Sequence, residues 1–391
     1  SGAARERYHP GNPSLSAPVV ATGGTGFGLM SMLVAIERNF VNRAEAVQRI
    51  EKILAFLESA ERFHGAWPHW INGNTGKVIP FSSLDDGGDL VETAFLCQGL
   101  VSVSEYFRDG NLEEKELAAK ARELWMGVEW DWYTQGDNAL YWHWSPNHGF
   151  EINFKLEGYN EVLITYVLAA ASPTHSISKN IYDSGWAANG NIQYDGTAYG
   201  YPLLLRHRGY AELGGPLFWS HYSYLGLNPN GLSDAYANYE EVNKNHATIN
   251  YAYCQENPKK FAGYGDGFWG LTASYSRNAD GSLGYSAHSP GNDLGIISPT
   301  AALSSMPYTP VQSMKALRSF YDNREKLLGP AGFYDAFSSD LNWVAEAYLA
   351  IDQGPQIIMI ENYRSGLLWN LFMRNEEVRA GLDKLGFSYQ N

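Results

Sequence analysis

The 391-residue chain has few cysteines and no long hydrophobic run. Its two cysteines, Cys97 and Cys254, are too few for a disulfide framework or a four-cysteine zinc site. No apolar run reaches the roughly 18 residues that a membrane-spanning helix needs. The longest covers residues 162–171 and is interrupted by Thr165 and Tyr166. The sequence therefore predicts a soluble protein.

Charge is also scarce, and it is mostly negative. Lys and Arg number 28 against 42 Asp and Glu, which gives a net charge of −14 with only 18% charged residues. No long basic run is present, so a nucleic-acid partner or an anionic membrane surface is not expected. Residues 1–8 show no basic region followed by an apolar one, so this stretch does not indicate a signal peptide, and one already removed remains possible.

Aromatic residues are abundant instead. The chain has 12 Trp, 26 Tyr and 17 Phe, and many of them lie in stretches rich in Gly, Asn, Asp and His that are typical of loops. Rings on loops can stack on the faces of a sugar while neighbouring polar groups bind its hydroxyls. A bulky aromatic core is the alternative. The candidate sugar-binding residues are Trp142, His143, Trp144, Trp219, His221, Tyr222, Phe268 and Trp269.

Helical periodicity recurs along the chain, and helices of two kinds alternate. Apolar helices are predicted at 26–39, 86–106 and 158–171, and amphipathic helices at 44–60 and 112–130. Further helices are predicted at 235–255, 310–328, 342–351 and 356–373, the last two separated by a helix stop at 352–355. Apolar helices indicate an inner layer and amphipathic helices an outer one.

About six such pairs predict an all-α fold, an (α/α)₆ toroid with long loops and minor β decorations. The alternative is an irregular α+β fold. No low-complexity linker interrupts the chain, so we expect a single domain over residues 23–391, preceded by an N-terminal extension over residues 1–22.

Asp85, Asp89 and Glu92 form the densest group of acidic residues. Their spacing of four and three places them on one face of a helix that starts near Asp85, where like charges repel. A structural explanation also exists, because the N-terminus of a helix favours carboxylates as caps and in its first turn. That explanation accounts less well for Glu92, which is surrounded by apolar residues.

Two further carboxylates are candidates. Glu161 precedes a nearly uncharged helix, and partial burial there would raise its pKa and suit it to donate a proton. Ordinary acidity of a first helical turn is the alternative. Asp352 is expected at the C-terminal end of an apolar helix, where the helix dipole disfavours a negative charge; a turn-forming Asp before Gly354-Pro355 is equally compatible.

Other site classes lack their motifs. The glycines from Gly24 to Gly28 do not complete a dinucleotide-binding loop, because neither register supplies the third glycine. We expect them to admit close helix packing or a ligand. His143, His148 and Glu151 lack metal-ligand spacing, and no G-x-S-x-G elbow is present, so neither a metal site nor a serine hydrolase is predicted.

Several strings together resemble a known family. They are SLDDGGDLVETA at 83–94, YNE at 159–161, YDAF at 334–337, NWVA at 342–345, DQGP at 352–355 and IENYRSGL at 360–367. The combination is similar to the bacterial glucoamylase-like family, the glycoside hydrolase family 144 group that contains endo-β-1,2-glucanases. The similarity extends from about residue 23 to residue 373.

The resemblance implies an (α/α)₆ fold that hydrolyses β-1,2-linked glucan with inversion and without a metal or other cofactor. It also implies export by a Gram-negative bacterium, to the periplasm or the medium. Partners beyond the glucan are not expected, and the chain is expected to be a monomer. The family's acidic cluster falls on Asp85, Asp89 and Glu92, and its separate essential glutamate falls on Glu161. The choice between endo and exo action is left open.

An inverting glycosidase needs one carboxylic acid and one carboxylate base. We expect Glu161 as the acid, and Asp89, then Glu92, then Asp352 as the base, with Asp85 binding sugar hydroxyls or tuning its neighbours. Arg364 could bind hydroxyls or pair with Glu361. The alternatives are an α-1,4-glucan hydrolase, an exo-acting sophorose-releasing enzyme, and a glycan-binding protein of an uptake system without catalysis.

Overall fold

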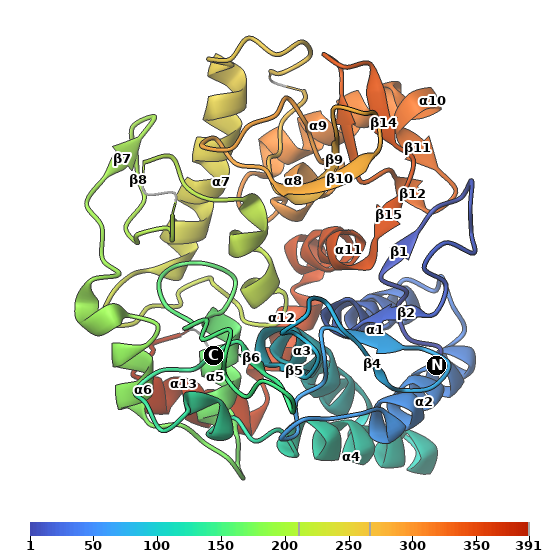
Figure 1. Ribbon diagram of the computed structural model, residues 1–391, viewed down its shortest axis with the longest axis vertical. Coiled ribbons are helices and arrows are strands. Elements are labelled where there is room, and N and C mark those ends of the chain that lie inside the picture. Colours follow the sequence, from blue (N-terminus) through green and yellow to red (C-terminus); the bar gives the residue numbers. More distant parts are fainter. Residues whose placement is uncertain (210–211, 266, 390–391) are drawn as a thin grey trace.

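The computed structural model describes residues 1–209, 212–265 and 267–389, and these residues are largely helical (Figure 1). The helices are α1 Thr22–Glu37, α2 Arg43–Ser59, α3 Leu90–Phe107, α4 Leu112–Met126, α5 Leu163–Ala171, α6 Lys179–Ser184, α7 Tyr239–Glu256, α8 Pro299–Ser304, α9 Pro310–Asp322, α10 Arg324–Leu327, α11 Ala350–Ser365, α12 Leu367–Met373 and α13 Glu376–Leu385. Within the described ranges four 3₁₀ turns join them, η1 Trp132–Thr134, η2 Ala188–Gly190, η3 Leu217–Ser220 and η4 Tyr222–Tyr224.

The strands are short and pair in small sheets between the helices. They are β1 Arg7–Tyr8, β2 Val19–Ala21, β3 Trp70–Asn72, β4 Val78–Ile79, β5 Gly88–Asp89, β6 His143–Trp144, β7 Thr197–Ala198, β8 Tyr201–Pro202, β9 Ala273–Arg277, β10 Leu283–Ala287, β11 Leu328–Gly329, β12 Gly332–Phe333, β13 Ala336–Ser338, β14 Trp343–Ala345 and β15 Tyr348–Leu349. The antiparallel β5–β6 pair matters most for the site, because it places His143 opposite Asp89.

The predicted alternation of helix types is present in the first four helices. α1 and α3 are buried along most of their length and carry few charges, whereas α2 and α4 bury one apolar face only. The two outer helices also have regular N-caps. The Asn42 side chain accepts from the N–H of Ala44, and Asn111 and Glu114 form a capping box at the start of α4.

Each inner helix packs against the next one around a ring. α1 packs against α3 and α11, α3 packs against α5, and α11 packs against α8. η3 and η4 close the gap between α5 and α8. α5 contacts η4 directly, and on the other side the Tyr308 hydroxyl donates to the Ser220 carbonyl at 2.8 Å. α2, α4, α9 and α13 pack outside this ring (Figure 1).

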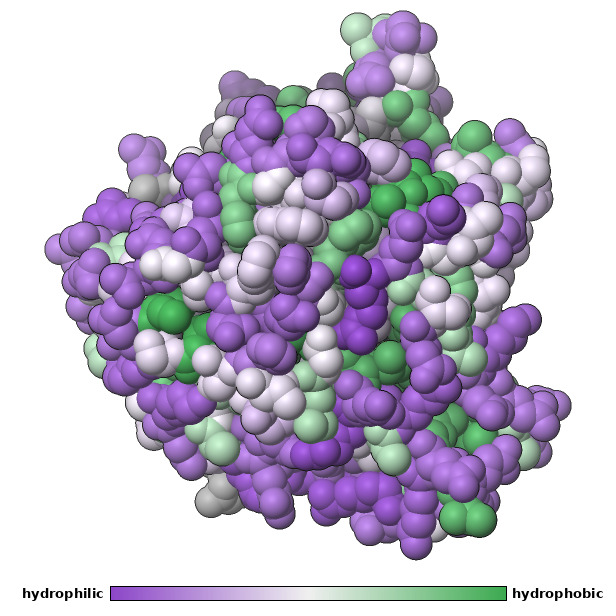
Figure 2. All heavy atoms as spheres, turned by 60° about the horizontal axis from the view of Figure 1, so that its bottom comes forward, coloured by the Kyte–Doolittle hydropathy of each residue, from purple (hydrophilic) through white to green (hydrophobic). Residues whose placement is uncertain are grey.

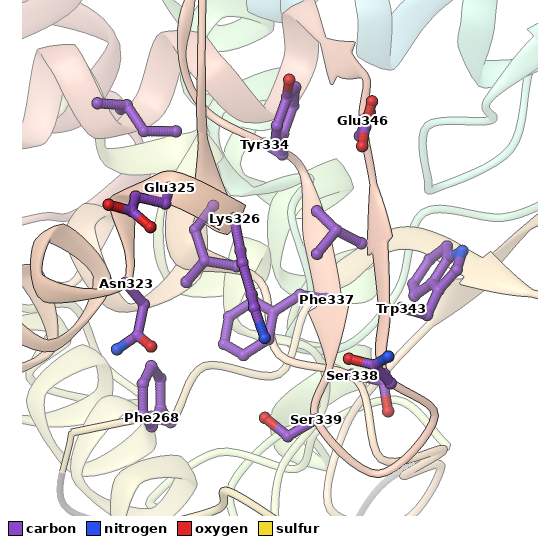
Figure 3. A pocket seen from close by; sticks show the side chains of 14 residues that line it. Phe268, Asn323, Glu325, Lys326, Tyr334, Phe337, Ser338, Ser339, Trp343 and Glu346 are labelled. Atoms are coloured by element: carbon purple, nitrogen blue, oxygen red, sulfur yellow. The ribbon is translucent and has the colours of Figure 1, made fainter.

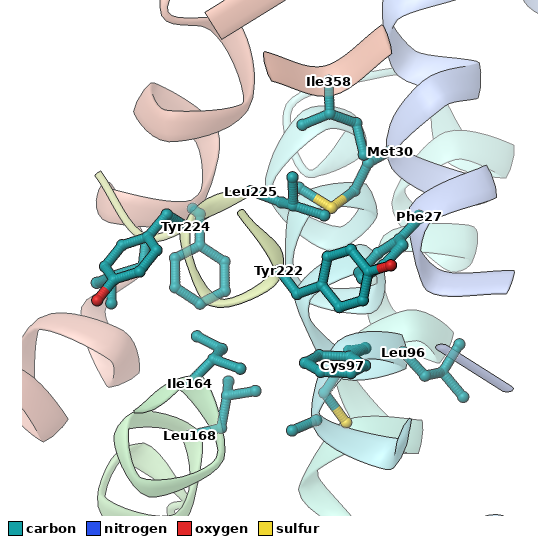
Figure 4. Close-up of a cluster of buried hydrophobic side chains, with 14 of the residues drawn as sticks. Phe27, Met30, Leu96, Cys97, Ile164, Leu168, Tyr222, Tyr224, Leu225 and Ile358 are labelled. Atoms are coloured by element: carbon teal, nitrogen blue, oxygen red, sulfur yellow. The ribbon is translucent and has the colours of Figure 1, made fainter. Parts of the chain in front are cut away.

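The middle of this ring is filled by side chains. Figure 4 shows a cluster of side chains from α1, α3, α5, α11 and the η4 segment with Leu225. They include Phe27, Met30, Leu96, Cys97, Ile164, Leu168, Tyr222, Tyr224, Leu225 and Ile358, all of them buried. Burial of this apolar surface is the main source of stability for such an arrangement.

The structure corrects the sequence prediction near Asp352. Residues 343–349 form β14 and β15 rather than a helix, and α11 continues through Gly354 and Pro355 instead of stopping there. Pro355 lies in the second turn, so it removes a single helical hydrogen bond. Gly354 lets α11 approach α1, because a Cβ there would lie 2.6 Å from the Cβ of Phe27. Asp352 therefore lies in the first turn of α11, where the helix dipole favours it.

The N-terminal residues pack against the body of the protein. β1 pairs with β15, and β2 joins β3 and β4 in a three-stranded sheet. The segment 1–22, predicted as an extension, thus contributes two strands, and α1 begins at Thr22. In the described part of the chain, none of the helices combines the length and the apolar character needed to cross a membrane. The face in Figure 2 is mostly hydrophilic, with scattered apolar patches.

The glycines of α1 account for its close contact with α3. A Cβ on Gly26 would lie 2.3 Å from the Phe95 carbonyl oxygen and 2.5 Å from the Leu96 Cα, which are backbone atoms that cannot move aside. A Cβ on Gly28 would meet only the Ala4 Cβ at 3.7 Å. The expectation that these glycines admit close helix packing is thus confirmed for Gly26.

We predict that Gly26→Ala destabilises the protein by about 1–3 kcal/mol or more, through overpacking of the α1–α3 contact. The matched variant Gly28→Ala, in the same helix, should be neutral or stabilising by up to about 1 kcal/mol, because Ala is the better helix former. Urea unfolding of both variants measures the difference. Equal stability of the two variants would contradict the packing argument.

Candidate active site

A cleft of about 460 Å³ opens beside the N-terminal ends of α3 and α5. Two glutamates, Glu92 and Glu161, are part of its wall. The other wall residues come from the N-terminal segment, from the loops around β3 and β6, from η3–η4, from the β9–β10 hairpin and from the start of α11. The cleft therefore collects residues that are far apart in the sequence around two carboxyl groups.

Asp89 caps the N-terminus of α3. One of its carboxylate oxygens, Oδ1, accepts from the N–H groups of Val91 and Glu92 at 3.0 and 2.8 Å. The other, Oδ2, lies 2.9 Å from Nδ1 of His69. Burial alone would raise the pKa of Asp89, but the hydrogen bond and charge of His69 lower it below its ordinary value. The Asp89 side chain has no exposed surface.

Glu92 lies one turn further along α3, at the cleft wall. Its Oε2 accepts from the backbone N–H of Gly23 at 2.6 Å. A side chain at position 23 would displace it, because a Cβ there would lie 2.7 Å from that oxygen. Burial raises the pKa of Glu92 to about 7, although the positive charge of His69 acts in the opposite direction.

His69 links the two carboxylates. Burial alone would lower its pKa, but the charge of Glu92 and the hydrogen bond to Asp89 outweigh burial and raise the pKa to about 9. His69 is therefore an imidazolium at neutral pH. His69 immediately precedes β3, and its side chain lines the cleft.

His143 and Asp85 form a second contact at the same end of α3. Nε2 of His143 lies 3.2 Å from Asp85 and 3.7 Å from Asp89. Donor atoms of His69, Asp85 and Asp89 lie within 4.8 Å of one another, a spacing that a metal ion could use. However, Asp89 already engages His69 and two backbone N–H groups, so this donor set is better explained as an ion-pair network.

Glu161 lies in the short segment that leads into α5. The neighbouring Asn160 side chain accepts from the N–H of Val162, and the Glu161 carbonyl accepts from the Ser223 hydroxyl. Burial raises the pKa of Glu161 to about 7, as expected from its place before an uncharged helix. Glu157 lies instead beside Lys155 and is not part of the cleft wall.

Asp352 is buried and is not part of the cleft wall. It forms a buried, hydrogen-bonded pair with Asp335, and the Tyr222 hydroxyl donates to its Oδ1 at 2.8 Å. Burial and the neighbouring Asp335 raise the pKa of Asp352 well above its ordinary value. Burial raises the pKa of Asp335 to about 6, while the N–H of Tyr275 donates to it. Burial therefore favours a proton on this pair, and the pKa of Asp352 is the more strongly raised of the two.

The predicted sugar-binding residues separate into groups. Trp142 and Tyr222 line the cleft with the glutamates, and His143 contacts the acidic cluster. The indole of Trp269 is fully buried, and Trp144, Trp219 and His221 pack away from the cleft wall. Phe268 lies in a different cavity, and Arg364 is exposed and outside the cleft wall. Glu361 pairs with Arg38 through two hydrogen bonds, not with Arg364.

Sequence reasoning did not find several residues of the cleft wall. They are Glu6, Arg7, His69, Trp70, Phe81, Phe218, Tyr275, Leu283 and Tyr285. The hairpin β9–β10 pairs Tyr275 with Tyr285 and carries both into the cleft. A lone histidine or tyrosine carries no spacing signal, and only Trp70 and Phe81, on either side of the stretch INGNTGK at 71–77, could have indicated a loop with aromatic residues.

Comparison with known proteins gives one family. A sequence profile of the family described as "Putative glucoamylase" matches residues 153–376. The chain belongs to this family. A curated relative from Parabacteroides distasonis, an "Exo β-1,2-glucooligosaccharide sophorohydrolase (non-reducing end)", is 46% identical over 98% of the chain. The chain spans about half of that relative, 55% of its length.

Two solved structures are similar over the whole chain. An endo-β-1,2-glucanase from Chitinophaga pinensis, solved with sophorotriose and glucose, is 56% identical, with a TM-score of 0.95 over 100% of this chain and 93% of that one. A β-1,2-glucanase from Parabacteroides distasonis is 45% identical, with a TM-score of 0.91 over 99% of this chain and 57% of that one. Both similarities support the family and the fold.

The Asp335–Asp352 pair leads to a test of whether Asp352 acts as a base. In Asp352→Asn the amide can still donate to Asp335 and accept from Tyr222, so turnover should stay within about threefold, whereas loss of a general base costs about 10²–10⁴-fold. A hundredfold lower kcat in a folded variant would instead place Asp352 in the chemistry.

The same variant should change the pH dependence of stability. Folding raises the pKa of Asp352 above its value in the unfolded chain, so the wild type loses stability as pH rises from the ordinary Asp value through the raised one. The variant lacks this loss. Its Tm relative to the wild type should rise from about pH 4 to about pH 8.

Proposed function

We propose that the protein is a glycosidase that hydrolyses β-1,2-linked glucan or sophoro-oligosaccharides with inversion of the anomeric centre. The observation that carries this proposal is the pair Glu92 and Glu161, two carboxyl groups of raised pKa in the wall of one cleft. Membership of the family supports it, and so do the β-1,2-glucan activities named for the similar proteins. Glycoside hydrolase family 144 is the class that we assign.

The surroundings of the two glutamates give each a role. An inverting hydrolase protonates the leaving oxygen with one carboxylic acid and activates water with a carboxylate on the other face of the sugar. His69 is a cation near Glu92 and favours its ionised form. Burial disfavours the ionised form of Glu161, and the charge of Arg208 offsets this only in part, so we assign the proton to Glu161. Glu161 is the acid and Glu92 is the base.

We assign the role of base to Glu92 in place of Asp89, the first candidate from the sequence. Both oxygens of Asp89 are engaged, by the N-terminus of α3 and by His69, and the side chain has no exposed surface. We assign to Asp89 the positioning of His69 and Glu92. Asp85, bonded to His143, orients the loop beside Glu92 and tunes the charge there. We assign to Asp352 the orientation of Tyr222, whose hydroxyl donates to it.

Glucose rings would stack on the aromatic wall of the cleft. Trp70 and Phe81 contact each other on one side, Trp142 lies beside the acidic cluster, and Tyr285 is contributed by the β9–β10 hairpin. Such rings bind the C–H faces of sugars. The guanidinium of Arg7, held by Glu6, supplies donors for hydroxyl groups at the same wall.

The remaining proposals concern architecture and location. The ring of inner helices α1, α3, α5, α8 and α11, completed by η3–η4 and surrounded by outer helices, supports an (α/α)₆ toroid in one domain over residues 23–391. We assign the protein to the periplasm or the medium of a Gram-negative bacterium, as a monomer. Endo action is proposed on the basis of the similarity to the Chitinophaga pinensis enzyme.

The substrate assignment is tested by digestion of linear β-1,2-glucan, with soluble starch and sophorose in parallel. Products are resolved by chain length over time. A ladder of short sophoro-oligosaccharides at early times is the expected result. Sophorose as the sole early product would replace endo by exo action, and hydrolysis of starch alone would overturn the substrate assignment.

We predict that Glu161→Gln lowers kcat/KM by about 10³-fold or more, because the leaving oxygen no longer receives a proton. In the wild type, activity should fall as pH rises above about 7, where Glu161 loses its proton. Values of kcat/KM measured from about pH 5 to about pH 9 show this fall of activity on the alkaline side. Full activity of the variant would contradict the assignment of the acid.

A second prediction tests the link between His69 and Glu92. His69→Gln removes a positive charge from the neighbourhood of Glu92, so the pKa of Glu92 rises and the acidic limb of kcat/KM moves to higher pH. Activity near pH 6 should therefore fall more than activity near pH 8. His64→Gln, a change of a histidine outside the cleft wall, is the control. If the pH dependence of kcat/KM were the same in His69→Gln as in the wild type, the proposed link between His69 and Glu92 would be excluded.

A further inference from the structure

A second cavity of about 490 Å³ lies on another part of the surface. It is formed by α10, the β13–β14 hairpin and Phe268, and it shares no lining residue with the cleft that holds Glu92 and Glu161. Figure 3 shows the side chains around it. The activity proposed above makes no use of this cavity.

The cavity is nevertheless connected to the cleft through the structure. The N–H of Tyr275, in the cleft wall, donates to Asp335, which immediately precedes β13. Trp343, in the wall of the second cavity, and Ile351, in the wall of the cleft, pack against the same small buried cluster, which contains Tyr275. The two sites are therefore parts of one folded unit.

Aromatic rings and neutral polar groups line the cavity. Phe268 and Trp343 are only partly buried and lie at opposite sides of it in Figure 3. The lining also includes the exposed side chains of Asn323, Asn342 and Ser339. Rings together with amides and hydroxyls are the groups that bind sugars, since rings stack on C–H faces and amides bind hydroxyls.

The charges of the lining favour a neutral ligand. Lys326 is the sole cation among the described residues that line the cavity, and Glu325 and Glu346 carry the opposite charge. Figure 3 shows Lys326 extended across the middle toward Phe337 and Ser339. A net negative lining disfavours phosphates and other anions, whereas an ammonium group in the middle donates well to hydroxyl oxygens.

We propose that this cavity is a second glucan-binding site, separate from the catalytic cleft. It holds part of a long β-1,2-glucan chain and so raises the concentration of polymer at the cleft. The identity of the glucan rests on the proposed function. Short oligosaccharides that fill the cleft alone gain nothing from the second site, so polymer and oligomer should respond differently to its loss.

The binding test uses Glu161→Gln, which blocks turnover, as the parent of two double variants. Trp343→Ala removes a ring, and Lys326→Ala removes an exposed side chain. Affinity electrophoresis in gels with linear β-1,2-glucan, soluble starch or no glucan measures retardation. Each double variant should bind β-1,2-glucan about tenfold more weakly than the parent, as expected for loss of a ring or donor contact worth about 1.4 kcal/mol.

The kinetic test uses the same substitutions in the active enzyme. KM for long β-1,2-glucan should rise severalfold, while kcat/KM for a short sophoro-oligosaccharide stays unchanged. Phe40→Ala, at a fully separate exposed ring, should change neither value and is the control. Equal loss on polymer and oligomer would place the effect in the cleft and overturn the second site.

The failure of each proposal is separately visible. Absence of β-1,2-glucan hydrolysis by the wild type would overturn the proposed function. Retardation by starch that is lost in the double variants would keep a second glucan site and change its ligand. Retardation equal in the parent and both double variants, or absent with every glucan, would overturn the second site.

Discussion

The hydrogen bond between Asp89 and His69 at the start of α3 is the interaction on which the site depends. A carboxylate without exposed surface is stable there because it caps a helix and pairs with an imidazolium at once. This fixes the first turn of α3, which carries Glu92 to the cleft wall against the N–H of Gly23. It also places a positive charge near Glu92, which favours the ionised form of that carboxyl group.

The ring of inner helices makes this electrostatic arrangement possible. α3 and α5 are nearly uncharged and buried, so a carboxyl group at the start of either helix is removed from water. Removal from water raises the pKa of both glutamates toward neutrality. Close helix packing maintains the dry surroundings, and it depends on glycine at position 26, where α1 and α3 touch backbone to backbone. The fold and the acid–base chemistry therefore have a common physical origin.

Much of the helical framework could be predicted from the sequence. The apolar pattern of α1 and α3 and the amphipathic pattern of α2 and α4 are local, so periodicity was sufficient. The prediction that a helix ends near Asp352 was wrong, because Gly354 and Pro355 are ordinary stop signals. Only the tertiary contact between Gly354 and Phe27 explains why the helix continues through them.

The candidate site shows the same limit. Glu92 and Glu161 were recognisable as carboxylates beside apolar helices, and the structure places both at one cleft. Trp269 is a core residue and Phe268 lines another cavity. Both were predicted to bind sugar, because ring type alone does not distinguish a core residue from a binding residue. His69 was missed, because it is 20 residues away from Asp89 in the sequence and only folding brings the two side chains into contact.

The state of the two glutamates is the central claim, and their titration tests it most directly. Protein labelled with ¹³C at the glutamate side-chain carboxyls would be followed by NMR against pH, with Glu92→Gln and Glu161→Gln used to assign the two resonances. The account predicts that Glu161 titrates near pH 7, and that Glu92 does so at higher pH once His69 is replaced by Gln. Titration of Glu161 near its ordinary value of 4.5 would contradict the account.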